Sequence, residues 1–250
     1  MAARPTSSTS SSEVRSVEAV LAWLSRRGRR RNVEGMARYG IVTPKAFGVS
    51  MATMAPLVRR LGRDHALAEA LWRTGWLEAR VLAGFVVDPA RLTPRLMDAW
   101  ARDFDHWAVT DSTCLHAFRR AAGAWGRVRA WSRRRGEFQR RAAFALLAGL
   151  AVHDTRAPDA RFLATFPDVR RAAEDDRPSV KKSVNWALRQ IGKRNEALRH
   201  AVLECLDVID ALDTPGARWI AGDARRELTS PAVRARLAAR ASRSPRGGPR

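Results

Sequence analysis

Hydrophobic residues recur along most of the chain at intervals of three and four, the spacing that places side chains on one face of an α-helix. The first such pattern runs from Val14 to Leu24. Further helices are predicted at residues 64–73, 76–87, 108–121, 137–151, 159–174, 178–192 and 196–211. No stretch alternates strictly between apolar and polar residues as a half-buried strand does. The pattern therefore predicts an all-α fold.

Hydroxyl–proline pairs supply the start signals of four more helices. A Ser or Thr suits the N-cap and a Pro suits the first helical position. Each pair precedes a helical apolar pattern of about 10 to 15 residues. The four pairs are Thr43-Pro44, Thr93-Pro94, Thr214-Pro215 and Ser230-Pro231.

Short helices with brief connectors predict antiparallel helix pairs, stacked as a bundle or as an α-solenoid. We expect one domain over residues 14–240, with disordered tails at residues 1–13, which are rich in Ser and Thr, and at 241–250, which are basic. A solenoid would offer a continuous concave basic face to a long polyanion.

Charge points to a polyanionic partner. The sequence holds 46 Lys and Arg against 25 Asp and Glu, a net charge of +21 at pH 7. Such a field attracts nucleic acid, the commonest polyanion in a cell. Only four of the basic residues are lysines, so a GC-rich genome could account for part of the arginine bias. Charge alone therefore predicts binding and says nothing about chemistry.

Several protein classes lack their signatures here. The best apolar stretch, residues 142–152, is far shorter than the roughly 18 to 20 residues of a membrane span. The N-terminus lacks the apolar core of a signal peptide, so we expect a cytoplasmic, nucleoid-associated protein. Cys114 and Cys205 form no CxxC motif, and no HExxH, GxxxxGK[ST] or GxGxxG motif occurs. We expect neither a metal nor a cofactor.

A carboxylate stands on an apolar helical stripe near the middle of the chain. If residues 109–118 are helical, one stripe carries Trp107, Asp111, Cys114 and Phe118. A buried charge needs a partner, a cap role or a function, because an unpaired one costs several kcal/mol. The simpler interpretation is a helix cap, since Thr110, Asp111 and Ser112 are all good N-cap residues.

Residues 119–141 form the most basic stretch of the chain. It carries one acid, Glu137, with Trp125 and Trp131 interleaved among nine arginines. The arginines are Arg119, Arg120, Arg127, Arg129, Arg133, Arg134, Arg135, Arg140 and Arg141. Such a stretch can follow a phosphate backbone, or it can be an exposed basic loop between helices.

The helix predicted at 178–192 places a tryptophan on a basic side. Its core stripe is Val180, Val184, Ala187 and Ile191. Trp186 lies about a third of a turn away, on the side that also carries Lys182, Arg189 and Lys193. Trp186 could instead pack against a neighbouring repeat.

Asp111, Trp107 and Trp186 together suggest a chemistry. A carboxylate between two aromatic faces could stabilise a cationic sugar while a glycosidic bond breaks.

At these residues the chain resembles the AlkD-type alkylpurine DNA glycosylases, HEAT-like repeat proteins of the DNA alkylation repair group. The resemblance runs from about Gly35 to Leu228. It rests on Gly35-Met36-Ala37-Arg38-Tyr39-Gly40-Ile41, Ala70-Leu71-Trp72, Glu78-Ala79-Arg80, residues 103–111, residues 137–144 and Asn185-Trp186-Ala187-Leu188-Arg189. It implies a HEAT-like α-solenoid, a monomer, and hydrolysis of N3- and N7-alkylated purines from duplex DNA without a deep base-flipping pocket.

The resemblance also implies roles for single residues. The family's catalytic Asp falls on Asp111, and its two sugar-contacting tryptophans fall on Trp107 and Trp186. The arginine in the family's helix that begins with a Gln-Arg-Ala-Ala type segment falls on Arg141, which would hold Asp111 or a phosphate. We expect DNA contacts from Tyr39, Lys182, Arg189, Lys193, Arg133, Arg134, Arg135 and Arg140. One departure is Ala108, where the family usually has an acid, and this puts local capping or hydrogen bonding in doubt.

Two alternatives to a glycosylase remain at this stage. One is a catalytically inactive module of the same fold that binds damaged or branched DNA. The other is a protein-interaction scaffold whose charge reflects genome composition. A DNA binder should lose affinity steeply with salt, whereas a scaffold should not.

Overall fold

The computed structural model describes residues 15–243, and within them every regular element is a helix, which confirms the predicted all-α fold. The chain divides into two compact units between Leu92 and Thr93. The predicted N-terminal tail lies outside the described residues. Of the predicted C-terminal tail, residues 241–243 belong to the last helix and the remainder lies outside the described part. No helix within residues 15–243 is long and apolar enough to cross a membrane.

The first unit packs short helices around a small aliphatic core. Its core includes Val20, Leu24, Leu57, Leu71 and Leu82. The helices are α1 (Val17–Arg27), α2 (Arg30–Met36), η1 (Ala37–Tyr39), α3 (Met51–Leu61), α4 (His65–Arg73), α5 (Leu77–Val86) and η2 (Pro89–Arg91).

The helix predicted directly after Thr43-Pro44 is wrong, because helix α3 begins only at Met51 with Ser50 as its cap. The carboxylate of Glu78 on α5 explains the delay. It is fully buried and accepts the backbone N–H groups of Phe47, Gly48 and Val49 at 2.9, 2.6 and 3.1 Å. Gly48 takes a φ of 78°, which glycine adopts readily. These N–H groups therefore bind a side chain of α5 and are not available for the hydrogen bonds of a helix.

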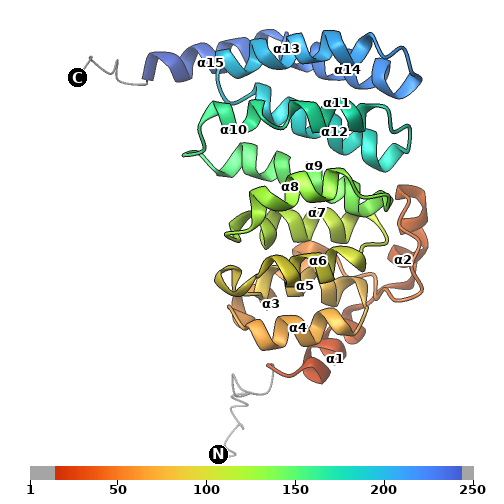
Figure 1. Cartoon of the computed structure of the whole chain (residues 1–250). Helices are drawn as coiled ribbons and strands as arrows, with labels where there is room; N and C mark the ends of the chain where they lie inside the picture. Colours follow the sequence, from red (N-terminus) through yellow and green to blue (C-terminus); the bar gives the residue numbers. More distant parts are fainter. Residues whose placement is uncertain (1–14, 244–250) are drawn as a thin grey trace, which may run out of the picture. The chain divides into compact units, whose positions relative to one another are not determined.

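The second unit stacks helices in layers (Figure 1). Helices α7, α9, α12 and α14 pack one against the next, while α8 packs on α9 and α13 on α14. This arrangement is an α-solenoid. The helices are α6 (Pro94–Arg102), α7 (Trp107–His116), η3 (Phe118–Arg120), α8 (Ala124–Ser132), α9 (Glu137–His153), α10 (Asp159–Leu163), α11 (Phe166–Ala173), α12 (Pro178–Gly192), α13 (Glu196–Asp210), α14 (Pro215–Leu228) and α15 (Pro231–Arg243).

Start signals of the second unit are confirmed, but two of its boundaries differ from prediction. Thr93 and Thr214 cap α6 and α14, each with a proline in the first turn. The helix predicted at 159–174 is two helices, α10 and α11, because Pro167 fits only the first turn of a new helix. The helix predicted at 108–121 ends at His116.

Helix α8 lies inside the arginine-rich stretch and was not predicted. Its buried residues Ala124, Val128 and Trp131 recur at helical spacing, while Arg129 is exposed and Arg127 pairs with Asp98. The basic stretch is thus not one exposed loop. Part of it is an outer helix that packs on α9.

Candidate active site

Asp111 lies inside helix α7 and does not cap it. His106 is the N-cap, and its Nδ1 accepts the Val109 N–H at 3.4 Å. Since α7 begins at Trp107, the proposed cap role of Thr110, Asp111 or Ser112 is wrong. Ala108 stands where the family usually has an acid, and the first turn of α7 has no acidic residue. The ring of His106 caps the helix instead.

Arg141 of α9 holds the carboxylate of Asp111 at both oxygens. Arg141 Nε donates to Oδ1 at 2.8 Å and Nη2 donates to Oδ2 at 2.6 Å. The remaining Nη1 donates to the Ser179 carbonyl at 2.8 Å, in the first turn of α12. One guanidinium therefore joins α7, α9 and α12. This bidentate geometry fixes the orientation of the carboxylate.

Burial and the ion pair act on Asp111 in opposite directions. Loss of solvation raises the pKa of the Asp111 carboxyl, while the hydrogen bonds and charge of Arg141 lower it, and the net pKa lies above its ordinary value. The side chain keeps 16% of its surface exposed. The side chain is thus not sealed from solvent, and each carboxylate oxygen has a lone pair to spare beyond its bond to Arg141.

The raised pKa predicts a pH effect on any reaction that needs the Asp111 anion. Because only the ionised form carries charge, the rate should rise with pH as the carboxyl loses its proton, and this limb should lie above the ordinary aspartate range. Single-turnover rates measured from pH 4 to pH 8 would show it. The limb should be absent from Asp111→Asn. A rate that is flat down to pH 4 in the unmodified protein would contradict this role.

Trp107 lies on the same helix as Asp111, and Trp186 lies on the same helix as Ser179, whose carbonyl binds Arg141. Trp107 lies one helical turn before Asp111, so both side chains share one face of α7, and 37% of Trp107 is exposed. Trp186 follows Ser179 by seven residues on α12 and so lies on the same side of that helix. The predicted core stripe of α12 is confirmed, since all four of its residues are buried and Trp186 is partly exposed.

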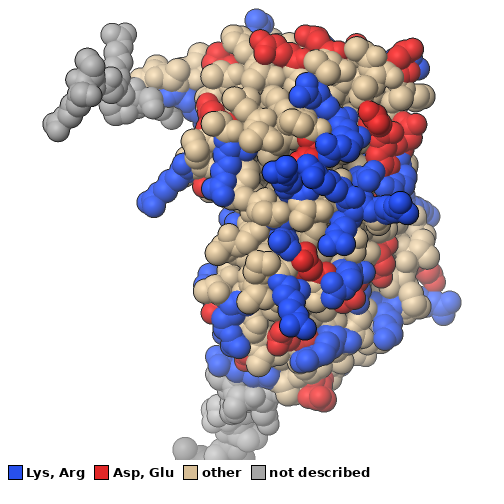
Figure 2. Space-filling view, viewed as in Figure 1, with Lys and Arg blue, Asp and Glu red and all other residues tan. Residues whose placement is uncertain are grey.

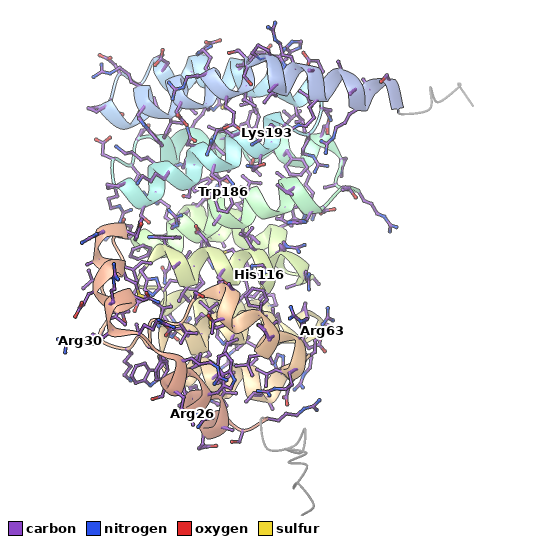
Figure 3. All side chains as sticks on the ribbon, turned by 180° about the vertical axis from the view of Figure 1, so that it is seen from behind. Arg26, Arg30, Arg63, His116, Trp186 and Lys193 are labelled. Carbon is purple, nitrogen blue, oxygen red and sulfur yellow. The ribbon has the colours of Figure 1, made fainter. Side chains whose placement is uncertain are left out.

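A polar chain along α12 fixes Trp186. With the Gln190 amide oriented to satisfy its neighbours, its oxygen accepts from Trp186 Nε1 at 3.2 Å and from Lys193 Nζ at 3.1 Å. Lys193 Nζ also donates to Glu227 Oε1 of α14 at 2.6 Å, and Arg189 pairs with the same carboxylate. Figure 3 shows Trp186 and Lys193 along this part of α12. The orientation of the indole is therefore fixed by Gln190 of α12, which is linked through Lys193 to Glu227 of α14.

The remaining predicted DNA contacts are paired arginines and exposed basic residues of the second unit, together with Tyr39 of the first unit. Arg133 pairs with Asp168 at 3.3 Å and Arg140 with Asp175 at 2.6 Å, so part of their charge is used inside the unit. The exposed group comprises Arg134, Arg135 and Lys182. Figure 2 shows Lys and Arg gathered across the layers of α8 to α12. Tyr39 belongs to the first unit, in η1, and is 73% exposed.

Two features of the site, Glu227 and Gln190, and the role of Glu78 inside the first unit were not predicted from sequence. Glu227 is far from α12 along the chain, so nothing in the sequence marks it as a partner. Gln190 follows Trp186 by four residues, and that helical spacing was the available signal. Glu78 belongs to a segment that carries the family resemblance, but no role was inferred for it. Within residues 15–243, no group of three His, Cys, Asp or Glu side chains is placed to bind a metal.

The sequence matches one protein family model, and the fold is similar to solved structures. A family model described as "DNA alkylation repair enzyme" matches residues 20–228. A solved structure described as "a new family of proteins related to the HEAT-like repeat DNA glycosylases with affinity for branched DNA structures" is similar with a TM-score of 0.69 and 18% identity, over 77% of this chain and 83% of that chain. A designed armadillo repeat protein with a (KR)4 peptide has a TM-score of 0.36 and 11% identity, over 76% of this chain and 91% of that one. No curated protein matches.

The similarity to the first of these structures is one of fold, and it agrees with a HEAT-like α-solenoid. The family model covers most of the chain, including α7, α9 and α12, which carry the clamped carboxylate and both tryptophans. The chain belongs to the DNA alkylation repair enzyme family.

Proposed function

We propose that this protein is a monofunctional DNA glycosylase that removes cationic N3- and N7-alkylated purines from duplex DNA. The observation that carries the proposal is the Asp111 carboxylate, held at both oxygens by Arg141 and placed one turn after an exposed tryptophan. A fixed, partly buried anion is suited to stabilise positive charge that develops beside it.

The reaction needs little besides that charge. An N3- or N7-alkylated purine already carries a positive charge, so when the C1′–N bond breaks, its electron pair neutralises the base and the base departs. Positive charge develops on the sugar as an oxocarbenium ion. Asp111 stabilises that ion and orients a water, whose oxygen forms the new bond to C1′. The water passes one proton to the solvent, and the products are a free base and an abasic site.

Trp107 and Trp186 supply the walls of the proposed sugar site. Aromatic faces favour a cation and exclude bulk water, which strengthens the attraction between Asp111 and the sugar. Arg141 acts as a positioning residue because it contacts Asp111 and not the proposed substrate. No lysine occurs on α7 or α9, and we assign Lys182 of α12 to a phosphate contact, so we infer hydrolysis and not a Schiff-base intermediate.

A second candidate is a catalytically inactive DNA-binding member of the same fold. It is favoured by the structural similarity to a protein family described as having affinity for branched DNA. Repeat folds can keep their shape while losing a reaction. The salt dependence of binding cannot separate these two candidates, because both contact phosphates, but base release can.

The test is to incubate the protein with duplex DNA methylated at guanine N7 and to measure the released base and the abasic sites. We expect free N7-methylguanine, an equal number of alkali-labile sites, and no protein–DNA adduct trapped by borohydride. Tight, salt-sensitive binding to duplex or branched DNA without base release would reject the glycosylase and support the second candidate. Weak binding without salt dependence would reject both.

A further inference from the structure

A basic cavity of about 140 Å³ lies at the C-terminal end of α12 in the second unit. It is lined by Ala151, Val152, Gln190, Lys193, Arg194, Arg236 and Arg240. Four of these seven residues are basic and none is acidic. The cavity is formed where the ends of α9 and α12 meet α15. Its walls therefore concentrate positive charge around a small space, which favours an anion.

Neutral carbonyl groups hold two of the arginines. Arg194 Nη1 donates to the Ala151 carbonyl at 2.7 Å and Nη2 to the Ala157 carbonyl at 3.1 Å. Arg240 Nη1 donates to the Lys193 carbonyl at 3.1 Å. These contacts position the guanidinium groups without cancelling their charge.

The protein compensates the charge of the cavity only in part, since Lys193 pairs with Glu227 while Arg236 and Arg240 line the cavity from α15. The buried Nε of Arg194 has no hydrogen-bond partner among the described residues. Burial lowers the pKa of Arg194, the charges of Asp159 and Asp154 raise it, and the charge of Arg240 lowers it, so that the net pKa lies below its ordinary value. Arg236 is exposed and pairs with no acid in the described part of the chain. A bound anion would offset this repulsion between like charges.

Gln190 connects the cavity to the proposed sugar site. It lines the cavity and also accepts the Trp186 Nε1 hydrogen bond. Trp186 and Gln190 are one helical turn apart, about 5.4 Å along α12. A DNA strand carries one phosphate per about 3.4 Å of duplex axis. The cavity is thus about one helical turn from Trp186, a separation comparable to one or two nucleotide steps.

We propose that this cavity binds a backbone phosphate of the DNA strand whose sugar contacts Trp186. The proposal rests on the function proposed above for Trp186. It adds residues that the family match does not include, because that match ends at residue 228 and Arg236 and Arg240 belong to α15. Helix α15 then acts as the outer wall of a phosphate site.

The first test removes one cavity arginine and compares it with a neighbour. Arg236→Ala should bind duplex DNA more weakly, and the slope of log affinity on log salt should become smaller by about 0.9, the value for one lost phosphate contact. Arg234→Ala is the matched control, because Arg234 is exposed on the same helix and does not line the cavity. An equal change of slope in both variants, or no change in either, would overturn the proposal.

The second test locates the phosphate. A duplex with one tetrahydrofuran abasic analogue has no glycosidic bond to cleave, so binding is measured without reaction. Single phosphates on either side of the analogue are replaced in turn by uncharged methylphosphonates. The unmodified protein should lose affinity most at one position within two nucleotides, and Arg236→Ala should show no further loss at that position while remaining sensitive elsewhere.

The outcomes separate this proposal from the glycosylase proposal. If Arg236→Ala and the unmodified protein lose the same affinity at every position, or if no position matters, the cavity is not a phosphate site, whatever the base-release assay shows. If the loss at one position depends on Arg236 while no base is released, the phosphate site stands and the glycosylase proposal alone fails.

Discussion

Replacing Arg141 with Met is expected to lower the free energy of unfolding at pH 7 by about 3–5 kcal/mol, the cost of leaving a buried charge without its partner. The methionine keeps most of the volume of the side chain. The Asp111 carboxylate, however, loses both of its hydrogen bonds from the guanidinium. The contact between α9 and the Ser179 carbonyl of α12 is lost as well.

The loss should shrink in acid. Asp111 without Arg141 keeps the burial that raises its pKa and loses the group that lowers it. A carboxyl whose folded pKa is raised favours the folded state most when protonated, and that contribution is lost as pH rises through the folded pKa. The Arg141→Met variant should therefore gain stability relative to the unmodified protein as pH falls toward 4.

Urea unfolding at pH 7 and at pH 4.5 measures this effect. Arg226→Met is the control, because Arg226 pairs with Asp223 on the surface and is 74% exposed, and such a pair contributes about 1 kcal/mol or less. The double variant Asp111→Asn with Arg141→Met should recover part of the loss, which gives the coupling energy. Equal losses for Arg141→Met and Arg226→Met would show that the Asp111–Arg141 pair contributes no more to stability than a surface ion pair.

Replacing Glu78 with Ala is expected to destabilise the first unit by at least about 3 kcal/mol, because three backbone N–H groups lose a charged acceptor. The residue is fully buried, so water cannot easily take its place. The segment around Gly48 should separate from α5, and the amides of Phe47, Gly48 and Val49 should lose protection from hydrogen exchange.

Hydrogen exchange followed by mass spectrometry resolves this segment from the rest of the chain. Glu69→Ala serves as the comparison, since Glu69 lies on α4 in the same unit and its side chain is 38% exposed. Unchanged protection over residues 47–49 in Glu78→Ala would contradict the assigned role. The same loss in Glu69→Ala would point to general instability of the unit.

Local sequence signals predicted much of the fold. Thr93-Pro94 and Thr214-Pro215 start helices because a capping hydroxyl and a proline satisfy the first turn without distant contacts. Thr43-Pro44 carries the same signal and starts none. There a tertiary contact, the Glu78 carboxylate, binds the N–H groups that a helix would have used. Local signals cannot anticipate such a contact 30 residues away along the chain.

The candidate site was predictable in its residue types and not in its connections. Helical spacing placed Trp186 off the core stripe of α12, and the structure agrees. The apolar stripe predicted through Asp111 is only partly correct, because the buried face of α7 is Val109, Thr110, Thr113 and Cys114, while Trp107 is exposed and Phe118 lies in η3. Which cation meets Asp111 depends on how α9 packs between α7 and α12, and only the family resemblance suggested Arg141. The pairing of Arg189 and Lys193 with Glu227 depends on the contact between α12 and α14.

The most direct measurement of the central claim is the single-turnover release of N7-methylguanine by the unmodified protein and by Asp111→Asn. Both are compared at DNA occupancies made equal from their measured affinities. Asparagine keeps the shape of the side chain and one acceptor oxygen while removing the negative charge. Release by the unmodified protein should be faster by about 100-fold or more, the usual effect of losing one electrostatic stabiliser. Equal rates at equal occupancy would contradict the claim that the Asp111 carboxylate drives base release.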